Sequence, residues 1–228
     1  MFQLTRNGPV LSGSLDSLRD RFATEHCVVL RNMLETTLLE QIQRNIERAQ
    51  WHSTAKTNLY TDSGAEWATE LTLDDPITIN VIDFLLNHSG FLNVIRIITG
   101  CNQISDFNNG RIYRMVASHQ HYISWHNDLN DKTRQAGFSM NLSTGVFRGG
   151  AFELRNCSTK KLLAQVDNTG LGDALLFRIS GDLEHRVTPI MEGVPKTACT
   201  GWFCATGTNY MKELIDGLQH KEDERTVR

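Results

Sequence analysis

The spacing of hydrophobic positions divides the chain into two unlike parts. Over roughly the first hundred residues, apolar side chains recur at intervals of three and four residues, as on one face of an amphipathic helix. From about residue 111, apolar residues fall in short runs rich in β-branched and aromatic side chains, separated by Gly, Asn and Asp. The pattern therefore predicts a mainly helical part over about residues 14–100 and a β-rich part over about residues 111–206.

Three helical segments are expected in the first part. The first begins near a Ser or Asp cap, carries Leu15, Leu18 and Phe22 at helical spacing, and leads into a short apolar strand at residues 27–30. The second, within residues 34–51, places its leucines and isoleucines on one stripe, so it is expected to pack on another element.

The third helical segment lies within residues 74–100. Asp74 or Asp75 is its expected N-cap, Pro76 suits its first turn, and Gly90 is expected to break it. The polar residues 52–70 that precede it are expected to form a loop.

Eight short strands are expected in the second part, with turn residues between them. They are residues 111–117, 121–127, 137–144, 150–156, 161–166, 173–180, 185–190 and 197–205. Eight short strands indicate a sandwich or barrel, of which the jelly roll is the eight-stranded form. No internal repeat or linker is visible, so we expect one domain over residues 1–228, with a β core and helices packed against it.

Composition narrows the range of partners. The chain has 228 residues, 40% of them hydrophobic, and a formal net charge of -3. This charge gives no electrostatic reason to bind nucleic acid or an anionic membrane. The N-terminus lacks the apolar region of a secretory signal, and five cysteines without a C-x-x-C motif suggest neither a disulfide framework nor a zinc site. We therefore expect a reduced, cytoplasmic protein. The oligomeric state is not indicated.

A dense histidine cluster, SHQHYISWHND, spans residues 118–128. If its second half is a strand, His126 and Asp128 share one face, whereas His119 and His121 have the opposite parity. His185, 57 residues after Asp128, is the best third ligand. Two histidines and a carboxylate form the facial triad of non-haem Fe(II) oxygenases. Taken alone, however, an H-x-D is as often an ordinary surface pair.

Further downstream, residues 169–203 (TGLGDALLFRISGDLEHRVTPIMEGVPKTACTGWF) contain several motifs in a fixed order. This order resembles Fe(II)/2-oxoglutarate-dependent dioxygenases of the prolyl-4-hydroxylase-like type. The matching positions are Gly172, Asp173, Ala174, Leu175, Phe177, His185, Val187, Pro189, Gly193, Lys196 and Trp202, together with the earlier pair Gly149 and Gly150. The resemblance covers residues 111–206 and, more loosely, 14–100. It implies a double-stranded β-helix (jelly roll) with N-terminal helices against it.

The resemblance also implies the chemistry. Fe(II) would be held by His126, Asp128 and His185, and O2 and 2-oxoglutarate would be consumed to give succinate, CO2 and a hydroxylated substrate. Halogenases of this superfamily replace the carboxylate with a small residue, so the presence of Asp128 favours oxygenation. Desaturation and ring formation stay open.

The family pairs the far carboxylate of 2-oxoglutarate with a basic residue, and Lys196 occupies that position. Lys196 follows His185 by 11 residues, one more than is typical of lysine members, and Pro195 marks the extra residue in the turn. Ala198 stands where the family often has Ser or Thr. Arg186 is a competing cation, but as the neighbour of His185 on a strand it should point away from the metal.

Two polar residues on apolar strands complete the expected cosubstrate site. Tyr113 resembles a tyrosine that contacts the cosubstrate carboxylate in related enzymes, although a core ring with a solvated hydroxyl is equally consistent with its neighbours. Asn141 shares parity with Ser139 and Ser143, so it contacts the cosubstrate if that face looks into the roll and is solvated if it does not. Both are expected to bind 2-oxoglutarate.

Three other conspicuous residues are expected to lie outside the metal and cosubstrate site. Trp125 and Trp202 are expected in the core, and Arg148 on a solvated loop, although it could meet an acidic substrate group. Residues 52–70 and 129–135 are expected to flank the mouth of the site and to determine specificity.

The size of the chain bears on the substrate class. A compact chain favours a small-molecule or amino-acid-like substrate, with peptidyl (prolyl-type) hydroxylation as the alternative. From other classes, a non-catalytic jelly-roll binding module stays open, as does a cupin-type metalloprotein using His119 and His121. No glutamate follows that pair before Asp128, as a cupin would require.

Overall fold

The computed structural model describes the backbone of residues 2–57 and 66–205, and the side chains of these residues apart from 55–57, 66–69 and 109. The first half alternates short strands and helices: β1 (Phe2–Thr5), β2 (Gly8–Leu11), α1 (Asp16–Glu25), β3 (Cys27–Leu30), α2 (Thr36–Arg48), β4 (Gln50–Thr57), β5 (Glu66–Asp74), α3 (Pro76–Leu86) and α4 (Ser89–Thr99). The second half is β-rich: β6 (Asp106–Met115), a 3-10 turn (Ala117–His119), β7 (Ile123–His126), β8 (Arg134–Asn141), β9 (Phe147–Gly149), β10 (Phe152–Asn156), β11 (Leu162–Val166), β12 (Ala174–Arg178), β13 (Leu183–Val187), β14 (Ile190–Gly193) and β15 (Lys196–Cys204).

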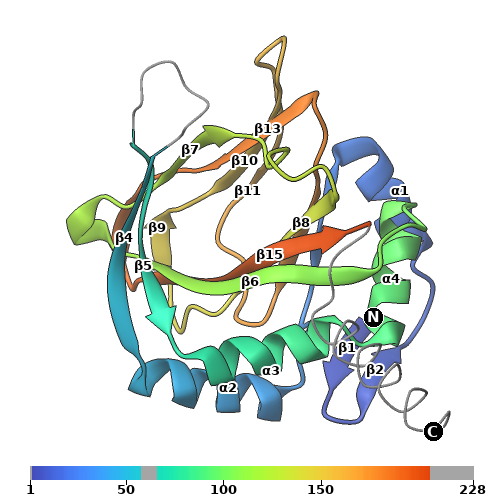
Figure 1. Cartoon of the computed structure of the whole chain (residues 1–228), viewed down its shortest axis with the longest axis horizontal. Coiled ribbons are helices and arrows are strands. Elements are labelled where there is room, and N and C mark those ends of the chain that lie inside the picture. The colour runs from blue at the N-terminus through green and yellow to red at the C-terminus, as the bar shows by residue number, and fades with distance from the viewer. Residues whose placement is uncertain (1, 58–65, 206–228) are drawn as a thin grey trace, which may run out of the picture.

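One antiparallel sheet of 11 strands curls round to form two facing walls (Figure 1). Strands β11-β10-β13-β7 make the first wall, and β6-β15-β8-β12-β3 make the second. Strand β5 joins them, because it pairs with β6 at Leu71 and Thr72 and with β7 through the single pair Ala68–Ile123. This is the double-stranded β-helix, so the predicted fold class is confirmed.

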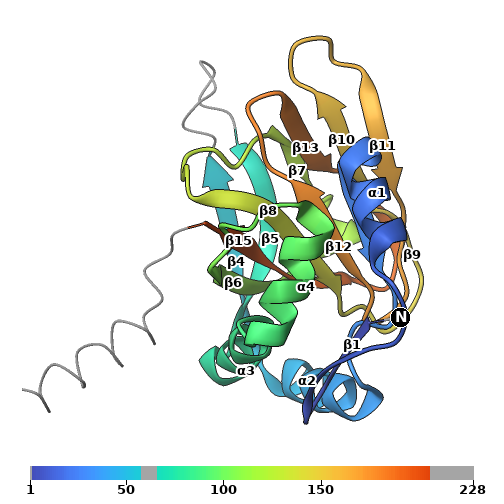
Figure 2. The same cartoon turned by 90° about the vertical axis from the view of Figure 1, so that its right-hand side faces the viewer.

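The helices cover the outer face of the second wall (Figure 2). The largest hydrophobic cluster lies between them and includes Phe22, Ile46, Phe91, Met140 and Phe203. Two smaller clusters fill the interior of the roll. The second wall is therefore packed on both faces, which makes it a rigid base for side chains that point into the roll.

All eight predicted strands are present, and β9 and β14 are additional. These two short strands pair with each other. They were missed because a run of three or four residues is too short to show alternation, and because Gly149 has a positive φ of 76°.

Two predictions about the first part are wrong. Residues 52–70 are not simply a loop, because Gln50–Thr57 and Glu66–Asp74 pair as the hairpin β4–β5, while residues 58–65 lie outside the described chain. The helix break lies at Asn87–His88 rather than at Gly90. His88 caps α4 by accepting from the Gly90 backbone N–H, so Gly90 belongs to the first turn of the second helix.

The cap at the start of α3 is one of the two that were predicted. The Asp75 side chain accepts from the backbone N–H groups of Ile77 and Thr78, and Pro76 occupies the first turn. In the part of the chain that the structure describes, no single helix is long and apolar enough to cross a membrane, and α3 with α4 reach that length and composition only as a pair bent by 64°.

An ion-pair ladder covers the outer face of the first wall. Arg155 on β10 pairs with Glu184 on β13 at 2.5 Å, and Arg186 on β13 pairs with Glu153 on β10 at 2.6 Å. These residues are direct cross-strand partners. Trp125 of β7 stacks against both arginines, 3.8 Å from the Arg155 guanidinium and 4.7 Å from that of Arg186. The ladder fixes the register of β13, which carries His185, from outside the roll.

Candidate active site

Three side chains that are distant in sequence meet at one end of a cavity inside the roll. His126 is the last residue of β7, Asp128 follows it, and His185 lies opposite His126 across the β7–β13 ladder. One ligand atom from each lies within 4.8 Å of the other two. Each histidine Nε2 is near a different carboxylate oxygen, at 3.6 Å for His126 and 3.5 Å for His185. Such an arrangement suits one divalent ion bound on a single face.

Both imidazoles direct Nε2 towards the Asp128 carboxylate. The Nδ1 atom of His126 lies 2.8 Å from the Ser124 carbonyl oxygen, so in the neutral ring Nδ1 donates and Nε2 carries the lone pair. Burial, reinforced by the neighbouring His126, lowers the pKa of His185 to about 3, so this ring is neutral at physiological pH. A neutral imidazole is the form that binds a metal.

The carboxylate of Asp128 is buried yet ionised. Burial alone would raise its pKa, but His185, His126, the Trp202 hydrogen bond and the Arg134 guanidinium together hold the pKa below its ordinary value. The donor set of two imidazoles and one carboxylate fits Fe(II). That these three residues bind the metal stays a prediction at this point, but the structure brings the three together.

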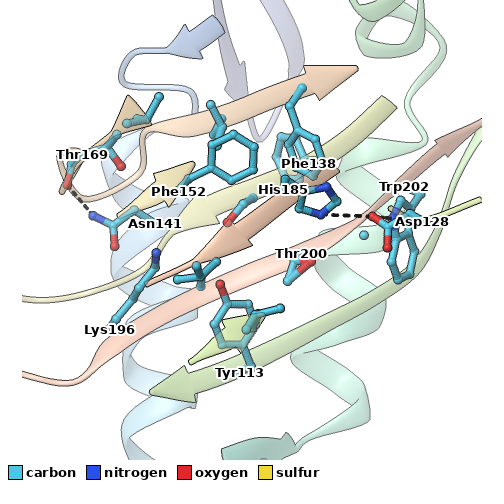
Figure 3. Close-up of a pocket in the computed structure, with 18 of the residues that line it drawn as sticks. Tyr113, Asp128, Phe138, Asn141, Phe152, Thr169, His185, Lys196, Thr200 and Trp202 are labelled. Atoms are coloured by element: carbon cyan, nitrogen blue, oxygen red, sulfur yellow. Dashed lines mark hydrogen bonds and ion pairs between the residues drawn. The ribbon is translucent and has the colours of Figure 1, made fainter. Parts of the chain in front are cut away.

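Trp202 and Arg134 support the carboxylate, and sequence reasoning missed both roles. The Trp202 indole N–H donates to Asp128 Oδ2 at 2.7 Å (Figure 3). Arg134 stacks 3.6 Å from the Trp202 ring and donates to the Asp128 backbone carbonyl at 3.2 Å. The expectation that Trp202 is a core residue is therefore wrong. Its even spacing from Lys196 along β15 was the available signal, since it puts both side chains on the same face.

The cavity extends from this cluster to Lys196 and Asn141 at its other end (Figure 3). Its volume is about 340 Å³, at the lower end of the range for ligand pockets. The Lys196 ammonium donates to the Gly150 carbonyl oxygen at 2.5 Å, and burial lowers its pKa to about 8. Among the residues described, no carboxylate pairs with Lys196, so the ammonium lies in the cavity wall without a counter-ion.

The glycine pair noted in the sequence shapes the surroundings of Lys196. Gly149 and Gly150 both have positive φ, at 76° and 64°. A side chain on Gly150 would clash with Ile190 and crowd the aliphatic part of Lys196. Glycine at this position therefore allows the lysine to lie along the backbone of the turn.

Tyr113 and Asn141 both line the cavity. The polar face of the strand that carries Asn141 therefore looks into the roll, which was one of the two orientations left open by the sequence. Burial and the nearby Glu70 raise the pKa of the Tyr113 hydroxyl, which is therefore a neutral donor. The Asn141 amide donates to the carbonyl oxygens of Thr169 and Gly170 and accepts from the Ser143 backbone N–H. In this structure Asn141 holds the β11–β12 loop against the cavity, and whether it also contacts a cosubstrate stays a prediction.

The remaining candidates lie away from the cavity. His121 is buried and its Nδ1 accepts from the Val116 backbone N–H, whereas His119 is exposed. Arg186 points outward, as predicted, into the outer ladder. Trp125 also belongs to that outer face rather than to the core. Arg148 lies on β9 rather than a loop and pairs with Glu192 at 2.8 Å, with 75% of its side chain exposed.

Comparisons with known proteins agree with this geometry. Residues 110–204 match the 2OG-Fe(II) oxygenase superfamily, that is, the Fe(II)/2-oxoglutarate oxygenases. No curated protein sequence matches the chain.

Several solved structures share the fold. An oxidoreductase of the 2OG-Fe(II) oxygenase family from Burkholderia pseudomallei has a TM-score of 0.65 at 13% identity, covering 90% of this chain and 96% of its own. A prolyl-4-hydroxylase from Pseudomonas putida has a TM-score of 0.58 at 17% identity, covering 83% of this chain and 98% of its own. A prolyl hydroxylase from Trichoplax adhaerens, in complex with a hypoxia inducible factor peptide fragment, has a TM-score of 0.56 at 14% identity. The match covers 83% of this chain and 88% of the Trichoplax chain.

The family match spans β6 to β15, the strands that carry the His-Asp-His cluster and Lys196. Residues 110–204 therefore match the 2OG-Fe(II) oxygenase superfamily, and this match together with the His-Asp-His cluster indicates an oxygenase that uses Fe(II), 2-oxoglutarate and O2.

Proposed function

We propose that this protein hydroxylates a small-molecule or amino-acid-like substrate, with His126, Asp128 and His185 holding Fe(II). The observation that carries the proposal is the buried cluster of three ligand atoms within 4.8 Å at one end of a cavity whose other end holds a lysine without a counter-ion. When bound, Fe(II) and 2-oxoglutarate supply the activation of O2, and 2-oxoglutarate is converted to succinate and CO2.

Lys196 is proposed to bind the far carboxylate of 2-oxoglutarate. A buried ammonium with one carbonyl partner gains most from an anion, because its own burial disfavours the charge. The neutral Tyr113 hydroxyl lies on the adjacent strand, on the same face of the sheet, since its Cα partner is Ala198. It can donate a second hydrogen bond to the same carboxylate.

Trp202 and Arg134 are proposed to orient Asp128. With the indole N–H occupying Oδ2, the carboxylate is held in one rotamer and presents its remaining lone pairs to the ion. The apolar side chains of Phe152, Leu175 and Phe177 line the same cavity and limit the access of water to the reacting centre.

The cavity size supports a small substrate. About 340 Å³ must accommodate the cosubstrate and the reacting part of the substrate together. Peptidyl hydroxylation is the second candidate, because the Trichoplax prolyl hydroxylase of the same fold is described in complex with a peptide.

The test is metal and cosubstrate binding in the absence of O2. Fe(II) with 2-oxoglutarate should develop the weak visible charge-transfer band of the bidentate chelate, and Asp128→Ala should lose it. His121→Ala is the matched control, because His121 is buried but lies outside the cavity. If His119→Ala and His121→Ala abolish metal binding while His126→Ala does not, the assignment is wrong.

The reaction itself is then followed by succinate release. A panel of free amino acids, small organic acids and short peptides should contain a compound that stimulates release above the substrate-free rate. Stimulation by peptides alone would favour the peptidyl alternative.

A further inference from the structure

Arg111 is a second cation of the cavity wall that the chemistry proposed above does not use. It lies on β6 two residues before Tyr113, on the same face, and it lines the cavity. Its Cα partner on β15 is Thr200, four residues beyond Lys196. At about 3.3 Å per residue, the Arg111 and Lys196 positions are about 13 Å apart along the sheet. The two cations therefore come from different ends of one wall.

The guanidinium has unused hydrogen-bonding capacity. Its Nη2 lies 3.2 Å from Oε1 of the fully buried Glu70, and its carbon lies 5.9 Å from the Tyr113 ring centroid. No described residue accepts a hydrogen bond from it, although a guanidinium carries five N–H donors in a fixed fork. The side chain retains 24% exposure, so a ligand can reach it.

The other arginine of the cavity is differently placed. Arg134 donates to the Asp128 backbone carbonyl and to Asn130 Oδ1, and it stacks on Trp202. Its Nη1 is thus engaged in supporting the metal cluster, while its buried Nε has no hydrogen-bond partner among the described residues. Arg111 is the cavity arginine that makes no hydrogen bond to any described residue, so its fork is available to a ligand.

The charge of the Arg111–Glu70 pair indicates the class of ligand. A guanidinium fork matches the two oxygens of a carboxylate. Because Glu70 already balances Arg111, the pair suits a group with a single negative charge better than a phosphate dianion, which would leave two uncompensated charges.

We infer that Arg111 binds a carboxylate of the substrate, which is therefore a free amino acid or another small carboxylic acid rather than an internal residue of a peptide. The inference rests on the proposed function and specifies its substrate class. Arg111 is then a specificity-determining residue, and Glu70 positions it.

A purely structural role makes a different prediction. If Arg111 only neutralises the buried Glu70, then removing both charges together should restore normal behaviour. The variants needed are therefore Arg111→Gln, the double variant Glu70→Gln/Arg111→Gln, and Arg148→Gln as a control that removes an exposed, ion-paired arginine outside the cavity.

The probes are glycine, the nineteen other standard amino acids in their L forms, and the carboxamides of all twenty, in which an uncharged amide replaces the carboxylate that Arg111 would bind. Succinate release above the substrate-free rate is measured for each pair, with full-length enzyme, Fe(II) and 2-oxoglutarate. In the wild-type protein and in Arg148→Gln, at least one acid should exceed its amide by about tenfold or more in kcat/KM. In both Arg111 variants this preference should fall to within about threefold.

The affinity for 2-oxoglutarate distinguishes a failure of this inference from a failure of the proposed function. The anaerobic Kd for 2-oxoglutarate should stay within about twofold in the Arg111 variants while it rises in Lys196→Met. The inference is overturned if the double variant keeps the acid preference, if the Arg111 variants lose 2-oxoglutarate as Lys196→Met does, or if no free acid outperforms its amide in the wild-type protein. If the wild-type protein forms no Fe(II)–2-oxoglutarate complex, it is the proposed function that fails.

Discussion

Replacing Trp202 with phenylalanine tests how the metal cluster is organised. The change removes the indole N–H that donates to Asp128 Oδ2 at 2.7 Å and keeps an aromatic ring beneath the Arg134 guanidinium. A hydrogen bond to a charged acceptor contributes about 1.5–3 kcal/mol. Since Asp128 is only 7% exposed, water cannot easily replace the lost donor. We therefore expect the hydrogen bond lost in Trp202→Phe to contribute an energy in the upper half of that range.

Part of this energy should appear as metal affinity. Loss of a partner that orients a ligand typically weakens metal binding about 10–100-fold. We therefore expect Trp202→Phe to weaken Fe(II) binding by at least tenfold, measured anaerobically by competition with a chromophoric chelator. The pKa of Asp128 should also rise, because one of the groups that lower it is gone. Metal affinity should then begin to fall at a higher pH than in the wild-type protein as the solution is acidified.

Trp125→Phe is the matched control. Trp125 lies next to His126 in sequence, but its ring stacks on Arg155 and Arg186 outside the roll. Its substitution should leave Fe(II) affinity within about twofold. Equal affinities in Trp202→Phe and the wild-type protein, or equal losses in the two variants, would refute the orienting role of the indole.

Three further predictions concern charge and packing. Because the Lys196 ammonium has a pKa of about 8, the Kd for 2-oxoglutarate should be nearly constant below about pH 7 and rise up to tenfold per pH unit above about pH 8, whereas Lys196→Arg should stay flat. Burial raises the pKa of Asp83 from 3.8 to about 6, so the stability that this group contributes below about pH 4 is lost as the pH rises towards 6. In urea titrations, Asp83→Asn should therefore be about 1–2 kcal/mol more stable than the wild-type protein at pH 7 and equally stable near pH 4. In thermal melts, Gly137→Ala should lower the free energy of unfolding by about 1–3 kcal/mol, because the added methyl group would overlap the Phe177 ring. Gly181→Ala is the control and should be close to neutral, because its methyl group would meet only Leu129 at 3.9 Å.

The strands of the roll were predictable because each buries alternate residues in a confined interior. The hairpin β4–β5 was not, because its cross-strand pairs are polar. His52 lies 3.1 Å from Asp74, and the hydroxyls of Thr54 and Thr72 are 3.0 Å apart. Such pairs stabilise a hairpin, yet in a single sequence they have the composition of a loop.

The residues of the site were likewise only partly predictable from the sequence. Strand parity and one distant histidine were sufficient to group His126, Asp128 and His185, since these depend on local alternation and on motif order. The partnership between Trp202 and Asp128 depends on how β15 lies across the roll from β7, and composition favours a core role for any tryptophan. The role of Arg111 was not predictable from the sequence for a related reason. Its partner Glu70 falls in a segment that was expected to be a loop.

The outer ion-pair ladder disfavours a shift in the pairing register of β10 and β13, whichever residues line the interior of the roll. A slip of two residues in either direction would bring Glu153 opposite Glu184 or Arg155 opposite Arg186, so like charges oppose both errors. The register of β13, which carries His185, is thus set against β10 on the outer surface of the roll. Residues lining the cavity can be exchanged, by evolution or by a protein engineer, without erasing that alignment. The roll can acquire a new substrate while keeping the metal ligands in place.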